Sequence, residues 1–111
     1  MTYWETIHTE PRDGFDIVVS VAPEDEDPSD HFMDDGETAQ AIANGEYDWF
    51  MARVEARAAG VTLGTAYLGG CCYERASDFV RAPSDYYADM IEEVIYNARH
   101  TARAIARKVA A

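Results

Sequence analysis

Eight carboxylates fall within the fourteen residues from 24 to 37, and this acidic window constrains the fold more than any other feature of the sequence. No Lys or Arg interrupts it, and only His31 in it takes up a proton near neutral pH. Like charges at this density repel one another, which opposes compaction, so we expect a surface segment. The carboxylates are those of Glu24, Asp25, Glu26, Asp27, Asp30, Asp34, Asp35 and Glu37.

The acidic excess of the chain lies entirely in its first half. Residues 1–50 hold 14 acids and one base, a charge of −13, whereas residues 51–111 hold 7 acids and 8 bases, a charge of +1. The sum is the net charge of −12. Such a charge disfavours direct binding to nucleic acid, which needs a basic surface. It fits a solvated loop that aids solubility, a docking surface for a basic partner, or an imitation of a nucleic-acid backbone.

Alternating polar and apolar residues predict a hairpin near the start of the chain. Strands are expected over 3–10 and 15–22, joined by a turn at Pro11–Gly14, because Asp-Gly accepts positive φ. Strict alternation in the first strand would put Ile7 on one face and both His8 and Glu10 on the other.

Three further elements follow from local pattern. Residues 37–44 favour a short helix that ends at Gly45. Residues 47–59 are ambiguous, and we interpret them as a strand because Phe50, Ala52, Val54 and Ala56 alternate with polar neighbours. Residues 61–73 are then a second strand, in which Gly69-Gly70 predicts a bulge.

Residues 85–109 carry the clearest helix pattern, with apolar residues at three- and four-residue spacing, acids at the start and bases at the end. Pro83 would end a helical turn over 77–81, and Ser84 would cap the long helix. The sequence therefore predicts an α+β fold, a small antiparallel sheet of three or four strands packed by a long C-terminal helix. The predicted core is Phe15, Ile17, Val19, Val21, Val54, Ile91, Val94 and Ile105. We expect one compact domain over 1–111, with an acidic loop and short-helix insertion at about 23–45.

No pattern points to catalytic, metal or cofactor chemistry, so no residue is assigned to any of these roles. Cys71 and Cys72 cannot bridge each other without strain and are expected to be structural thiols. A calcium loop starting at Asp25 would need Gly at its sixth position and Glu at its twelfth, where the chain has Asp30 and Gly36. The glycines near Gly69 lack the Lys that completes a phosphate loop.

A basic stripe, Arg99, Arg103 and Arg107, lies on one face of the long helix. It has three interpretations. It can match the helix dipole and be solvated, it can contact nucleic acid against an opposing net charge, or it can pair with the acidic window. That pairing could form within the fold or across a dimer.

The chain resembles the small acidic proteins that phages and plasmids carry. The resemblance rests on its length, the lack of catalytic motifs, the predicted α+β fold and the tract Glu24-Asp25-Glu26-Asp27-Pro28-Ser29-Asp30. Anti-CRISPR and anti-restriction proteins belong to this class, and many of them occupy a basic nucleic-acid channel. The resemblance implies a non-enzymatic inhibitor of a host nucleic-acid-binding defence complex, acting in the host cytoplasm. The eight carboxylates of the acidic window would be its partner-binding residues.

The expected partner is therefore a basic protein surface, with no direct nucleic acid and no membrane, and the protein would be a monomer or a homodimer. Two alternatives remain open. One is an acidic regulatory or assembly module that binds a basic protein. The other is a small ligand-binding protein or enzyme with a pocket between sheet and helix. Because Asp25, Asp27, Asp34 and Asp35 lie outside the core pattern, we expect charge reversal at these four positions to leave the fold intact.

Overall fold

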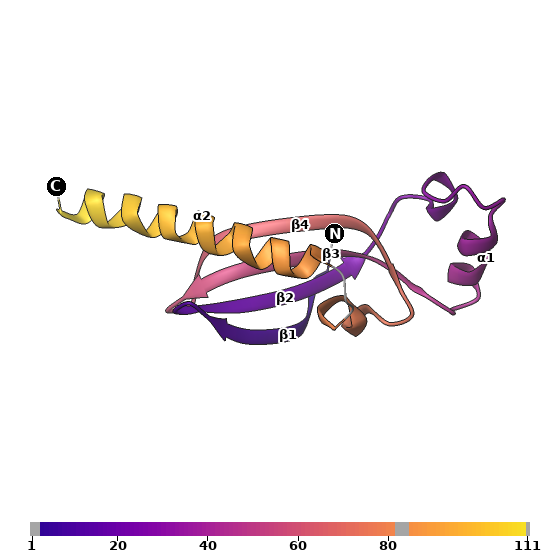
Figure 1. The fold of residues 1–111 in the computed structure, drawn as a ribbon, viewed down its shortest axis with the longest axis horizontal. Helices are drawn as coiled ribbons and strands as arrows, with labels where there is room; N and C mark the ends of the chain where they lie inside the picture. Colours follow the sequence, from indigo (N-terminus) through magenta and orange to yellow (C-terminus); the bar gives the residue numbers. More distant parts are fainter. Residues whose placement is uncertain (1–2, 82–84, 111) are drawn as a thin grey trace.

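The computed structural model describes residues 3–81 and 85–110 and has the predicted α+β architecture (Figure 1). Four antiparallel strands follow one another across a single sheet in the order β1-β2-β3-β4. They are β1 (Glu5–Arg12), β2 (Phe15–Pro23), β3 (Asp48–Ala58) and β4 (Val61–Tyr73). Helix α1 (Glu37–Ala43) lies between β2 and β3, and helix α2 (Asp85–Ala110) follows β4. Two short 3-10 helices, η1 (Pro28–Asp30) and η2 (Ala76–Val80), complete the chain order.

Both strand pairs close through two-residue turns with positive φ. In the first turn φ is 55° at Asp13 and 87° at Gly14, and in the second it is 51° at Ala59 and 78° at Gly60. These values belong to the turn type whose twist matches that of paired strands. The first turn is therefore shorter than the predicted Pro11–Gly14 turn, and β1 continues through Pro11, which an edge strand tolerates.

A bulge in β1 changes which of its side chains face the helix. The pairing shifts register between Thr6 and His8, after which His8 lies opposite Val19 and Glu10 opposite Ile17. Paired residues share a face, and Val19 and Ile17 belong to the core. The expectation of strict alternation is therefore wrong for His8 and Glu10, because the extra residue in the strand reverses the faces beyond it. The predicted bulge in β4 is confirmed, since Gly69 and Gly70 lie opposite the single residue Met51, where the pairing of β3 with β4 shifts register.

The core lies between one face of the sheet and α2, which packs on β3 and β4. The backbones of α2 and β4 approach closely at Gly64, where a Cβ atom would lie 2.3 Å from the carbonyl oxygen of Val94. A residue without a side chain is needed there for the helix to reach the sheet. Predicted core residues that are buried are Ile17, Val19, Val21, Val54, Ile91 and Val94.

Two predicted core residues are not buried. Phe15 is half-buried at the edge of the core, and Ile105 is 48 % exposed. The exposure of Ile105 follows from the length of α2, which continues beyond the turns that end the sheet (Figure 1). The apolar stripe of the helix persists where the sheet no longer covers it. The helical turn predicted over 77–81 is observed as η2, whereas the expected stop at Pro83 and cap at Ser84 lie outside the described residues.

A polar cluster joins α2 to the edge strand. Tyr87 Oη donates to Glu10 Oε1 at 2.5 Å, and Arg12 Nη2 donates to Glu10 Oε2 at 2.9 Å. His8 Nε2 lies 3.4 Å from Glu10 Oε1. The Tyr87 hydroxyl is the main cause of a lowered Glu10 pKa, assisted by Arg12, while burial and the Glu10 carboxylate raise the pKa of Tyr87. The cluster fastens the start of the helix to β1.

We expect Gly64→Ala to lower the free energy of unfolding by about 1–3 kcal/mol, because the new methyl group must push α2 away from β4. Gly69→Ala is the matched control, since its Cβ would meet only the flexible carboxylate of Glu24, at 3.1 Å. Urea unfolding of both variants measures the difference. Equal losses for the two variants would contradict the close approach at Gly64.

Tyr87→Phe should cost about 1 kcal/mol at neutral pH, because it removes a hydrogen bond to an ionised carboxylate. The pKa of Glu10 is lowered from 4.5 in the folded protein, so its ionised form stabilises the fold above that pH. This stabilisation is lost as the pH falls through the lowered pKa. Urea unfolding at about pH 7 and about pH 3 should therefore show a smaller difference between wild type and variant in acid. A difference that is the same at both pH values would contradict the role of the Glu10 charge.

Candidate partner-docking surface

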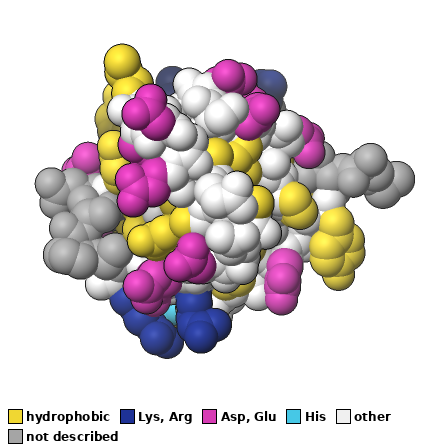
Figure 2. All heavy atoms as spheres, turned by 90° about the vertical axis from the view of Figure 1, so that its right-hand side faces the viewer, with side chains coloured by type: hydrophobic (Ala, Val, Ile, Leu, Met, Phe, Trp, Pro, Cys, Tyr) yellow, Lys and Arg dark blue, Asp and Glu magenta, His cyan; other side chains and the backbone are white. Residues whose placement is uncertain are grey.

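The acidic window and α1 form one extension, residues 24–46, which projects beyond the end of the sheet opposite the C-terminus of α2 (Figure 1). It holds nine acids and no Lys or Arg. Figure 2 looks onto this end, where Asp and Glu side chains are spread over the face and Lys and Arg lie towards its edges. None of the residues of α1 is buried. The extension thus presents its charges to solvent on several sides.

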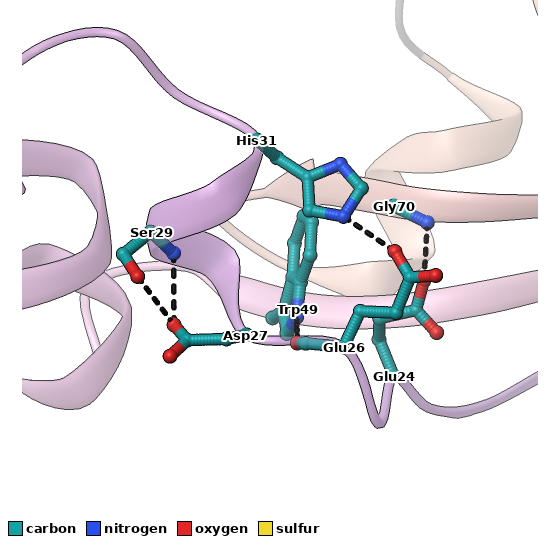
Figure 3. A network of polar contacts seen from close by, with 7 residues as sticks. All are labelled: Glu24, Glu26, Asp27, Ser29, His31, Trp49 and Gly70. Carbon is teal, nitrogen blue, oxygen red and sulfur yellow. Dashed lines mark hydrogen bonds and ion pairs between the residues drawn. The ribbon is translucent and has the colours of Figure 1, made fainter.

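Trp49, from the start of β3, anchors the extension to the sheet (Figure 3). Its indole Nε1 donates to the carbonyl oxygen of Glu26 at 2.9 Å. The ring centroids of His31 and Phe32 lie 5.2 and 5.8 Å from that of Trp49, in edge-on and tilted arrangements. An aromatic ring with a polar group can fix a loop both by packing and by hydrogen bonding. The chain from 24 to 32 is held against β3 in this way.

Four of the eight carboxylates make contacts within the fold, so they are not equivalent to the rest. Glu24 Oε1 accepts from Gly70 N at 2.8 Å, and Glu26 Oε2 accepts from His31 Nε2 at 2.5 Å. The first contact ties the extension to the bulge in β4 and the second holds His31 in place beside Trp49 (Figure 3).

Asp27 is the N-cap of η1, and Asp34 bonds to the first turn of α1 from two residues before the N-cap, Gly36. Asp27 Oδ1 accepts from Ser29 N at 3.0 Å and from Ser29 Oγ at 2.8 Å, at the start of η1. Asp34 Oδ2 accepts from Thr38 N at 3.1 Å and from the Thr38 hydroxyl, at the start of α1. The backbone bond from Ser29 is the main cause that lowers the pKa of Asp27, and the Thr38 hydroxyl is the main cause for Asp34. Because of these bonds, we expect charge reversal at Asp27 and Asp34 to weaken the local structure at the starts of η1 and α1, whereas Asp25 and Asp35 make no such bond with the described residues.

The other four side chains are exposed and make no hydrogen bond or ion pair with the described residues. We call them the free carboxylates, and they are the groups that remain able to meet a partner. They are Asp25, Asp30, Asp35 and Glu37.

Sequence reasoning missed the anchor at Trp49 and the division among the carboxylates. Two spacings could have indicated the division, because an Asp two residues before a Ser, or shortly before a helical Thr, commonly caps the intervening turn. No local signal marks Trp49, since its partners Glu26 and His31 are 23 and 18 positions away.

The thiols of Cys71 and Cys72 are the remaining chemically reactive groups. Burial raises the pKa of the Cys71 thiol to about 11 and, to a smaller extent, raises that of Cys72, in keeping with the structural role expected for both. Within residues 3–81 and 85–110, no three His, Cys, Asp or Glu side chains are grouped so as to hold a metal ion. No helix in the described part of the chain is both long and apolar enough to cross a membrane.

We expect Asp34→Ala to loosen α1 while Asp25→Ala, at one of the free carboxylates, does not, because only Asp34 bonds to the first turn of that helix. Amide hydrogen exchange over residues 37–44 should become faster by on the order of fivefold in the first variant, with unchanged exchange in β2 and β3. Equal exchange in the two variants would contradict the capping role of Asp34.

No protein-family model, curated protein or solved structure matches this chain. The contacts, burial and charges of the described residues are therefore the basis for inferring its function.

Proposed function

We propose that the protein inhibits a nucleic-acid-binding complex of the anti-CRISPR or anti-restriction type by docking the acidic extension on the basic site of that complex. The observation that carries the proposal is the set of free carboxylates, held on an extension that Trp49 anchors to the sheet. A charged loop that is already ordered loses little conformational entropy when it binds. This distinguishes it from a solvated acidic tail, which must be ordered at the moment of binding.

Charge supports the choice of a basic partner. Residues 24–46 carry nine acids without a Lys or Arg, and their field extends over about 10 Å at moderate salt. Such a field speeds encounter with a positive cleft and weakens as salt is added. Duplex DNA presents about one charge per 1.7 Å of its axis, so the extension can replace a few phosphates of a bound duplex.

Apolar contact area is also present at this end. Met33 is fully exposed between Asp30 and Asp35 in the sequence, and Tyr47 is partly exposed after α1. Buried anchors of this kind supply most of the binding energy in protein interfaces, while rim charges mainly set the association rate. The extension thus offers both components of an interface.

The alternative of an acidic regulatory or assembly module uses the same surface and differs in one respect. A module that binds a basic protein outside its nucleic-acid site leaves that site open, so nucleic acid does not compete. Competition by duplex DNA therefore distinguishes the two functions.

We expect simultaneous reversal of the four free carboxylates to Lys to abolish capture of basic nucleic-acid-binding proteins from a bacterial lysate at low salt. The matched control reverses four exposed acids elsewhere, Asp16, Glu74, Asp89 and Glu93, and changes the net charge equally. Wild type and control should retain the same proteins, and an excess of duplex DNA should release them. Mass spectrometry identifies the proteins, and urea unfolding checks that both variants fold.

Two results would contradict the proposal. One is retention of the same proteins by the Lys variant, which would make the extension a solvated loop. The other is capture of proteins that duplex DNA does not release, which would favour the regulatory module.

A further inference from the structure

A second surface, at the opposite end of the molecule, is not used by the proposed function. Beyond the sheet, the apolar stripe of α2 continues through Ala102, Ile105, Ala106 and Val109, although 48 % of Ile105 and 81 % of Val109 is exposed. Together with the β3–β4 turn, this stripe forms a groove of about 530 Å³. Its walls are apolar side chains only, and those from the strands are Ala58, Val61 and Leu63. We call it the tail groove.

The helix tail that forms one wall of the tail groove carries cations on its other faces. Residues 99–111 contain four bases and no acid. Arg99 lies 3.7 Å from Asp13, whereas Arg103, Arg107 and Lys108 are exposed and have no carboxylate partner in the described part of the chain. An apolar groove on a positively charged helix tail favours an apolar side chain whose neighbours in the chain are negative.

The acidic extension has that chemistry, because Met33 is fully exposed and carboxylates flank it on both sides in the chain. It cannot reach the tail groove of its own molecule, since the two lie at opposite ends of a body 59 Å long (Figure 1). Of the two ways in which the basic stripe could pair with the acidic window, pairing within the fold is therefore excluded. Pairing with another copy remains.

We propose that the tail groove binds the Met33 segment of a second copy, in an antiparallel dimer that two identical contacts close. Antiparallel alignment places each acidic extension beside the basic tail of the other molecule, and a twofold axis satisfies both ends at once. Direct packing of one α2 tail on another would bury the same apolar residues. It would also bring two sets of unpaired cations together, which like-charge repulsion opposes.

This inference goes beyond the proposed function and has a consequence for it. Asp30 and Asp35 lie three positions before and two positions after Met33 in the chain, so the dimer would cover some of the free carboxylates that the partner requires. Self-association and partner binding would then compete for one surface, and the monomer would be the active form. A variant with a defective tail groove and an intact extension should still capture the partner.

Sedimentation equilibrium of the full chain tests the dimer over a range of concentrations at low and high salt. Wild type should form dimers that weaken as salt is added. Arg103→Glu with Arg107→Glu should raise the dissociation constant about tenfold or more, and so should Asp30→Lys with Asp35→Lys. An equimolar mixture of these two charge variants should restore the dimer. In the mixed dimer one contact joins two wild-type surfaces, and the other joins an acidic tail to a basic extension.

Matched controls separate the contact from general effects of charge and apolarity. Glu74→Lys with Glu93→Lys changes the net charge as the acidic variant does and should keep the dimer. Ile105→Gln with Val109→Gln should dissociate it, whereas Tyr67→Gln, at an exposed position on the other face of the sheet, should not. Circular dichroism verifies the fold of each variant.

A monomeric wild type at all concentrations in low salt would overturn the proposal, as would a mixture of the charge variants that stays monomeric. A dimer that survives the acidic variant and is lost in the Ile105 and Val109 variant would show pairing of the two helix tails instead. None of these results depends on partner capture, so the dimer and the inhibitory function can fail independently.

Discussion

Repulsion among the carboxylates of residues 24–37 is the constraint to which much of this structure responds. Such a segment cannot be buried, and it can pack against itself only if hydrogen bonds or opposite charges offset the repulsion. The fold places it beyond the end of the sheet and uses half of its carboxylates as hydrogen-bond acceptors. Glu24 and Asp34 show the principle, because each accepts from backbone amides that the loop or the neighbouring element would otherwise leave without a partner. These hydrogen bonds therefore order the backbone of the acidic segment locally.

Trp49 makes this solution possible because it contributes to both the sheet and the extension. Its backbone belongs to β3, and its indole bonds to Glu26 and contacts His31. The acidic segment therefore has a defined position relative to the sheet, which a solvated tail would not have. A partner that meets the free carboxylates meets groups whose spacing the fold has largely set.

The local sequence pattern was sufficient to predict the strands and helices, but not how far each one packs against its neighbours. Alternation at Val19 and Val54 and helical spacing at Ile91 and Val94 predicted the sheet, the helix and most of the core, because these periodicities reflect which face is buried. The same spacing wrongly included Ile105, because the stripe of a helix does not reveal how long the opposing sheet is. The bulge in β1 was missed for a similar reason, since one extra residue reverses every later face without changing the composition.

The candidate site shows the same division between local and tertiary information. The concentration of charge was visible in the sequence, and its location at the surface followed from it. Which carboxylates are free depends on their hydrogen-bond partners. Three of these partners, Ser29, His31 and Thr38, are close by in the chain, whereas Gly70 is far away.

The length mismatch between α2 and the sheet has a counterpart at the other end of the molecule. One end has an apolar groove with cations that the fold does not pair, and the other has an exposed Met33 with carboxylates that the fold does not pair. Each end is incomplete by the criteria that apply to a monomer surface, where exposed apolar groups are usually scattered and charges of both signs are mixed. The unpaired charges of the two ends have opposite signs, and both ends expose apolar side chains. A second copy can therefore pair the charges and cover the apolar side chains at both ends. A basic partner can satisfy only the acidic end, which is why the dimer and the complex with a partner would be alternatives.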